Sequence, residues 1–129
     1  MKLISTSLSL NIEPSMADVN KALLDIQNVK QYPVIILAHN KTNYLQTIYS
    51  KEGYVLKYQC GSVEDRFISK DNLNIDKISK AFKLYLQSNI LWKGGIEFEK
   101  INKTKPASFR LGYIAGSIAV KISKFFKHK

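Results

Sequence analysis

The chain has 129 residues, of which 45% are hydrophobic and 23% charged, a composition typical of one globular domain. Its single cysteine, Cys60, excludes an internal disulfide and fits a reducing compartment. The net charge of +10 is unevenly placed: residues 1–99 have a balance of +2, whereas residues 100–129 hold eight basic residues and no acidic ones. This asymmetry indicates an anionic partner or surface for the C-terminal segment.

The N-terminal part of the chain changes from a period of two to a helical period. Residues 3–12 place apolar side chains at every second position, which predicts one half-buried strand. Ser15 is a good N-cap, and Asp18 three residues later completes a capping box. Apolar residues then recur at helical spacing over 16–29, so we expect an amphipathic helix there.

Four short strands are expected next, separated by turns. A continuous apolar run at 34–38, rich in β-branched residues, predicts a central strand covered on both faces. Further strands are expected over 44–49, 54–59 and 64–69, and Gly53 suits a turn that needs a positive φ. The regular spacing of strands and turns favours antiparallel hairpins.

A second helix and a last strand complete the predicted domain. Asn74 is the expected N-cap of this helix, and alternation over 96–101 predicts the strand. The helix buries a stripe of apolar side chains: Ile75, Ile78, Phe82 and Tyr85. The fold class is therefore α+β, with an antiparallel sheet, two packed helices and a basic amphipathic helix at the C-terminus.

The basic segment is expected to form a unit of its own after the α+β domain of residues 1–101. Residues 102–107 are polar, basic and closed by a proline, which is typical of a linker. Residues 108–129 predict an amphipathic helix. Its apolar stripe consists of Leu111, Ile114, Ala115, Ile118, Ile122 and Phe125. Its small-residue stripe consists of Gly112, Gly116, Ala119 and Ser123, and its polar stripe includes Arg110, Tyr113, Ser117, Lys121 and Lys124.

The C-terminal helix leaves several interpretations open. Its apolar run is too short for a bilayer span, which needs about 20 residues. It can lie on an anionic membrane surface, bind nucleic acid, pack on its own sheet or pack on a second copy in a homodimer. Because the N-terminus lacks an apolar block of signal-peptide length, we expect a cytoplasmic protein.

No catalytic, metal or cofactor motif stands out in the sequence. His39, Cys60 and His128 lack the paired spacing of zinc ligands. Glu97 and Glu99 share a strand face about 7 Å apart, which a solvated face or a docking edge explains better than acid–base catalysis. We therefore expect no enzyme, metal or cofactor. An enzymatic function would require a cavity that collects His39, Cys60 or acidic groups.

Residues 43–101 contain a set of aromatic, glycine and apolar positions at the expected strands and helix. They are Tyr44-Leu45-Gln46, Gly53-Tyr54-Val55-Leu56-Lys57-Tyr58, Gly61-Ser62, Ala81-Phe82, Tyr85-Leu86, Trp92 and Phe98-Glu99. In these positions the chain resembles small bacterial α+β proteins, some of which are immunity proteins of polymorphic or contact-dependent toxin systems. The resemblance implies a non-enzymatic protein that blocks a cognate toxin, and it carries over no active-site residue.

The expected partner is therefore a protein toxin, bound through exposed sheet and loop residues. The residues predicted to contact it are Trp92, Glu97, Glu99, Arg110, Lys121, Lys124 and Lys127. The alternative of a different class is a nucleic-acid or anionic-membrane binder that acts through the basic helix. Salt separates the two hypotheses, because phosphate binding weakens steeply with salt whereas a largely apolar protein interface weakens little.

Overall fold

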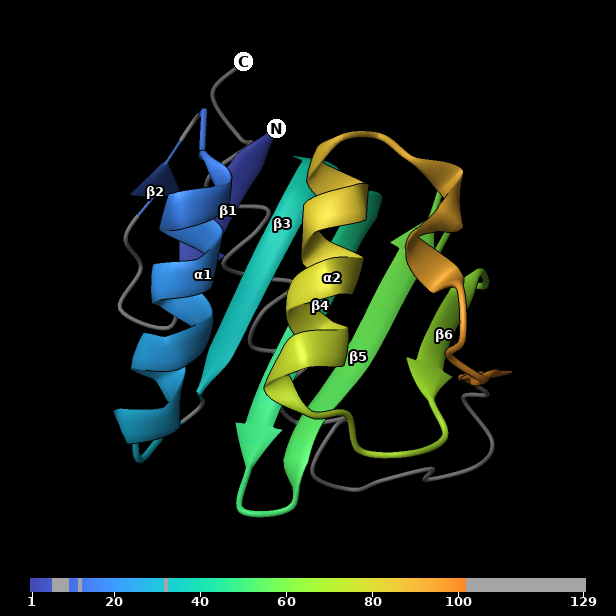
Figure 1. The fold of residues 1–129 in the computed structure, drawn as a ribbon. Helices are drawn as coiled ribbons and strands as arrows, with labels where there is room; N and C mark the ends of the chain where they lie inside the picture. Colours follow the sequence, from blue (N-terminus) through green and yellow to red (C-terminus); the bar gives the residue numbers. More distant parts are fainter. Residues whose placement is uncertain (6–9, 12, 32, 102–129) are drawn as a thin grey trace.

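The computed structural model describes residues 1–5, 10–11, 13–31 and 33–101, which form a seven-stranded antiparallel sheet with two α-helices against one face (Figure 1). The strand order is β2-β1-β3-β4-β5-β6-β7. The predicted α+β class is thereby confirmed for this part of the chain. The expected linker at 102–107 and the expected basic helix at 108–129 lie outside the described residues.

Most predicted elements are present with small changes of boundary. The strands are β1 (Lys2–Ser5), β2 (Leu10–Asn11), β3 (Val34–Asn40), β4 (Asn43–Ser50), β5 (Gly53–Cys60), β6 (Arg66–Ser69) and β7 (Phe98–Lys100). The helices are α1 (Met16–Asp25) and α2 (Ile75–Leu86), with 3₁₀ turns η1 (Ile26–Asn28) and η2 (Ile90–Lys93). The predicted antiparallel meander is confirmed, since β3, β4, β5 and β6 pair in sequence.

The prediction of one strand over residues 3–12 is wrong. The chain reverses there, and β1 pairs with β2 in antiparallel register, with Leu3 opposite Asn11 and Ile4 opposite Leu10. A period of two can continue through a reversal, because each arm of a hairpin alternates in the same way. Alternation therefore identified β structure here without identifying the turn.

The first helix begins as its sequence predicts. The Asp18 N–H donates to Ser15 Oγ at 3.2 Å, and the Ser15 N–H donates to Asp18 Oδ2 at 2.8 Å, which completes the capping box. The α-helix is shorter than the expected 16–29, because its last turn tightens into η1. Val19 and Leu23 are fully buried against the sheet.

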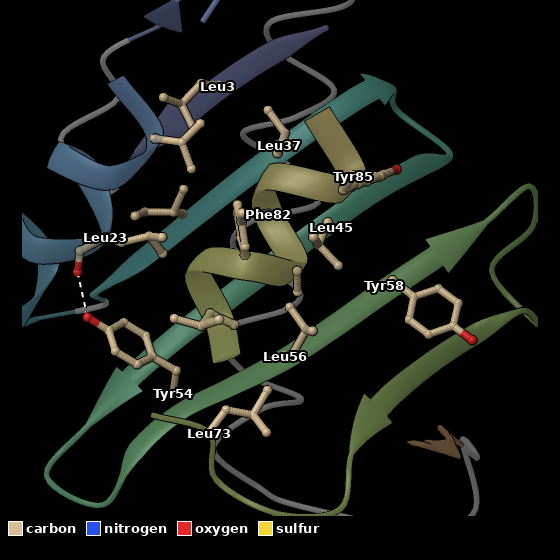
Figure 2. Packing of buried hydrophobic residues seen from close by; sticks show 14 of the residues in the cluster. Leu3, Leu23, Leu37, Leu45, Tyr54, Leu56, Tyr58, Leu73, Phe82 and Tyr85 are labelled. Atoms are coloured by element: carbon tan, nitrogen blue, oxygen red, sulfur yellow. Dashed lines mark hydrogen bonds between the residues drawn. The ribbon is translucent and has the colours of Figure 1, made fainter. Parts of the chain in front are cut away.

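Tyr54 ties this helix to the sheet. Its hydroxyl donates to the backbone oxygen of Leu23 at 2.7 Å and accepts from Gln27 Nε2 at 2.9 Å (Figure 2). Gly53, at the start of the same strand, has φ +125°, and a Cβ there would lie 2.8 Å from the Leu73 carbonyl oxygen. A glycine is thus required at the β4–β5 turn.

The sheet buries side chains on both of its faces. Both described α-helices lie on one face, here called the helix face (Figure 1). The larger cluster is on that face and includes Leu37, Leu45, Leu56, Phe82 and Tyr85 (Figure 2). A second cluster, on what we call the opposite face, consists of Ile4, Val34, Ile36, Ala38, Tyr44 and Ile48. All residues of the run 34–38 are buried, as expected for a central strand.

Candidate protein-binding site

The turn after α2 is strained. The Ser88 N–H donates to the Tyr85 oxygen at 2.9 Å and the Asn89 N–H donates to the Leu84 oxygen at 2.8 Å, the two bonds of a Schellman motif. Ser88 occupies the left-handed position of this motif with φ +56°, where glycine is usual. Backbone strain of this kind costs about 1 kcal/mol or more, and it is concentrated at functional sites.

This turn presents two large apolar side chains to solvent. Asn89 Oδ1 accepts from the Leu91 N–H at 2.9 Å and so begins η2. Ile90 is 86% exposed and Leu91 is 67% exposed, the highest exposures among the described large apolar side chains. Trp92 follows and is half-buried. We refer to Ile90, Leu91, Trp92 and Lys93 as the η2 surface.

Trp92 anchors the η2 surface in an aromatic cluster. Its ring lies 4.9 Å from Tyr58 in an edge-on arrangement, 5.8 Å from Phe98 and 5.5 Å from Tyr85, all measured between ring centres. Tyr58 in turn stacks on Phe67 at 4.9 Å. Offset and edge-on pairs of this kind are each worth about 0.5–1.5 kcal/mol beyond area burial. The cluster therefore gives the short turn a rigid base.

Lys93 places a positive charge beside this apolar surface. Its ammonium lies 4.5 Å from the centre of the Tyr58 ring and 5.4 Å from that of Trp92. A cation over an aromatic face at an exposed site contributes about 0.5–1 kcal/mol. The η2 surface thus joins apolar groups, an anchored tryptophan and one cation, a composition typical of protein–protein contacts.

A cavity of about 420 Å³ lies beside the η2 surface. Its described lining includes His39 at the end of β3, Cys60 at the end of β5, and Tyr85 of α2. The His39 ring meets Tyr85 edge-on at 5.3 Å, burial lowers the pKa of His39, and burial raises the pKa of Tyr85. Cys60 is exposed. The described lining residues include no Asp or Glu, so no carboxylate among them orients the histidine.

A second cavity, of about 720 Å³, lies near the β4–β5 turn. Its lining carries charges of both signs, including those of Lys30, Lys51, Glu52, Lys70, Asp71 and Glu99. Mixed charges around an open cleft indicate no preference for one sign of ligand. This cavity therefore favours no particular chemistry.

The opposite face holds polar groups that the sequence did not single out. Gln46 and Lys57 are adjacent in the β4–β5 register and are 0% and 2% exposed. Among the described residues, neither polar atom of the Gln46 amide has a hydrogen-bond partner. Burial lowers the pKa of Lys57 to about 8, and the positive charge of Arg66 contributes to a smaller extent. Alternation placed Lys57 away from Leu56, but only the apolar run at 34–38 signalled that this face is covered too.

The structure separates the predicted contact residues. Trp92 lies in the aromatic cluster, on the helix face with Phe98. Glu97 and Glu99 are exposed, and Glu99 alternates with Phe98 and so projects toward the opposite face, away from Trp92. The remaining predicted contacts, Arg110, Lys121, Lys124 and Lys127, lie outside the described residues. Sequence reasoning missed Ile90, Leu91 and Lys93, because η2 is too short to show a period.

Neither a metal site nor a membrane span is found among the described residues. No group of three or more His, Cys, Asp or Glu side chains within them could hold a metal ion. Among the same residues, no helix has the length and apolar character needed to cross a membrane. Compared with protein-family models, with curated proteins and with solved structures, the chain gives no match.

Proposed function

We propose that this chain is a non-enzymatic protein-binding module, an immunity-type protein that binds a cognate bacterial toxin in the cytoplasm and occludes it. The observation that carries the proposal is the η2 surface. Two exposed apolar side chains, Ile90 and Leu91, stand beside a half-buried tryptophan on a rigid aromatic base. An aromatic anchor surrounded by apolar contact area is the usual centre of binding energy in an interface.

The local geometry supports recognition without a large rearrangement. The turn is held by a Schellman motif, by the Asn89 cap and by Trp92 against Tyr58, so little order has to be gained on binding. Lys93 beside the apolar pair favours a partner with an acidic residue next to its own apolar patch. A positively charged inhibitor and an acidic toxin surface would also associate faster through electrostatic steering.

Affinity capture from the native host, followed by a toxicity test, examines this proposal. We expect the unaltered chain to retain one protein at a 1:1 ratio, and Leu91→Asp to reduce its retention at least 100-fold, as expected for loss of about 3 kcal/mol at an interface centre. The matched control is Leu24→Asp, because Leu24 on α1 is also exposed, at 53%. It should retain the partner fully.

The captured protein must then behave as a toxin. Expressed alone it should arrest growth, and expressed together with this chain it should not, whereas the Leu91→Asp variant should fail to protect. A captured partner that is harmless alone, or protection that is unchanged by Leu91→Asp, would contradict the proposal.

A second candidate function is binding of nucleic acid or an anionic membrane through the basic C-terminal helix. It is favoured by the eight basic and zero acidic residues within 100–129. Its test is a salt series with a labelled single-stranded RNA and with vesicles of anionic lipid. Replacement of Lys121, Lys124 and Lys127 by Gln should reduce the slope of log affinity against log salt by about 2–3, roughly one phosphate contact per lysine. An unchanged slope would exclude this role for the three lysines.

A further inference from the structure

The opposite face of the sheet is buried although the described α-helices are on the other side. The six apolar side chains of its buried cluster (Ile4, Val34, Ile36, Ala38, Tyr44 and Ile48) are at most 8% exposed. Gln46, between Tyr44 and Ile48 on β4, and Lys57 beside it on β5 are also almost fully buried. A face of this composition is stable only when another layer excludes water from it.

We propose that residues 102–129 of the same chain form that layer. The polar linker crosses β6 and β5, and the apolar stripe of the helix expected over 108–129 packs on β4, β3 and β1. This inference is independent of the proposed function, because the η2 surface and Trp92 lie on the helix face.

The position at which the described chain ends favours this arrangement. The Ile101 N–H donates to the Arg66 oxygen at 2.8 Å, so the chain is still held beside β6 when the described part ends. Among the described strands, β7 is an edge strand, and it pairs only with β6. A segment that leaves this edge can return over either face, and the helices α1 and α2 already occupy one of them (Figure 1).

The order of polarity along the chain matches the order of polarity across the face. From β7 toward β1 the face is first mixed, with Arg66 and Ile68 on β6 and Lys57 and Val55 on β5, and then apolar, with Ile36 and Ile4. The chain likewise continues with the polar linker 102–107 and then with the apolar stripe. Where the linker passes from β5 toward β4, its backbone carbonyls would also supply acceptors near the Gln46 amide, which has none in the described structure.

The dimensions agree as well. A helix over 109–126 would be about 27 Å long at ~1.5 Å per residue. The eight residues of β4 extend over about 27 Å at ~3.4 Å per residue. Small residues beside the apolar stripe, such as Gly112 and Gly116, allow the helix backbone to approach a sheet closely. Arg110, Lys121 and Lys124 then lie on the outer side, in solvent.

Cysteine protection in the full-length chain tests the proposal, in a Cys60→Ser background that removes the exposed native thiol. Ala38→Cys reports on the opposite face and Ala81→Cys on the helix face, since these alanines are 0% and 2% exposed and the change is small. The apolar stripe is disrupted by Ile114→Asp with Ile118→Asp. The matched control, Tyr113→Asp with Ser117→Asp, adds the same charge to the polar stripe.

We expect the Ala38→Cys thiol to be protected in the unaltered and control chains and to react about 100-fold faster or more in the stripe variant, as for a local opening of the cover. Ala81→Cys should stay protected in all three chains, which shows that the helix face remains folded. Equal protection of Ala38→Cys in the stripe variant and the control would overturn the proposal. Protection that falls on 100-fold dilution of the unaltered chain would also overturn it, because a second copy would then be the cover.

Discussion

The two faces of the sheet are buried by different means. On the helix face, α1 and α2 supply aromatic and aliphatic side chains, and polar groups such as the Tyr54 hydroxyl have partners. On the opposite face, aliphatic side chains adjoin the Gln46 amide, which has no hydrogen-bond partner in the described part of the chain, and a buried lysine, Lys57. Unpaired buried polar groups reduce stability, so the helix face should contribute most to folding and the opposite face should depend more on its cover.

Truncation of a core side chain on each face gives the largest expected effect. Phe82→Ala on α2 should lower the free energy of unfolding by about 4 kcal/mol, because the ring is 0% exposed. Ile36→Ala on the opposite face should lower it by about 3 kcal/mol. Urea unfolding followed by circular dichroism measures both values.

The same two truncations, repeated in a chain whose apolar stripe is disrupted, distinguish the two faces of the sheet. Combined with Ile114→Asp and Ile118→Asp, Ile36→Ala should have an effect of less than about 1 kcal/mol, since a side chain without a cover loses little on truncation. The effect of Phe82→Ala should not change in that background. If the effect of Ile36→Ala also remains at about 3 kcal/mol, its cover does not involve the apolar stripe.

Much of the helix face could be predicted from the sequence. The Ser15 cap, the Asn74 cap and the stripe that ends in Tyr85 are local signals, read from residues three or four positions apart. The central strand was equally clear, because its run is apolar at every position. These elements specify their own structure within a few residues.

The candidate site was less predictable because its geometry is not local. Trp92 was predicted to contact a partner, but its contacts within the domain, which come from β5, β7 and α2, were not predicted. The exposure of Ile90 depends on the left-handed Ser88, which no residue preference announces. The burial of Lys57 depends on what lies over the sheet, and alternation along one strand does not contain that information.

The second prediction concerns the buried lysine. Lys57→Met keeps the length of the side chain and removes the ammonium from its desolvated position. Since a lysine that titrates at about pH 8 instead of 10.5 lowers the free energy of unfolding at neutral pH by about 3 kcal/mol, the variant should be more stable by up to that amount. Urea unfolding at pH 7 provides the measurement.

The pH dependence of the free energy of unfolding of the unaltered protein tests the same effect of the buried Lys57. Between pH 8 and 10 the unfolded chain binds more protons at Lys57 than the folded chain, so the free energy of unfolding should rise with pH in this window. Above about pH 10 the buried tyrosines, whose pKa values are raised in the fold, act in the other direction. Lys57→Met should abolish the rise between pH 8 and 10, and a rise that persists in this variant would assign it to another group.

The smallest expected effects come from replacing one tyrosine by phenylalanine on each face of the sheet. Tyr54→Phe removes two hydrogen bonds, to the Leu23 oxygen and from Gln27, and should cost about 2 kcal/mol. Tyr44→Phe removes one, from the Tyr44 hydroxyl to Gln59 Oε1 at 3.0 Å, and should cost about 1 kcal/mol.

Tyr49→Phe is the control for this pair, because the Tyr49 hydroxyl makes no hydrogen bond to a described residue; its effect should stay within about 0.5 kcal/mol. The Tyr44 result bears directly on the comparison of the faces. If water reaches the opposite face, the freed Gln59 oxygen is hydrated and Tyr44→Phe has almost no effect. An effect of about 1 kcal/mol that disappears when the apolar stripe is disrupted would instead show that the dryness of this face depends on the C-terminal segment.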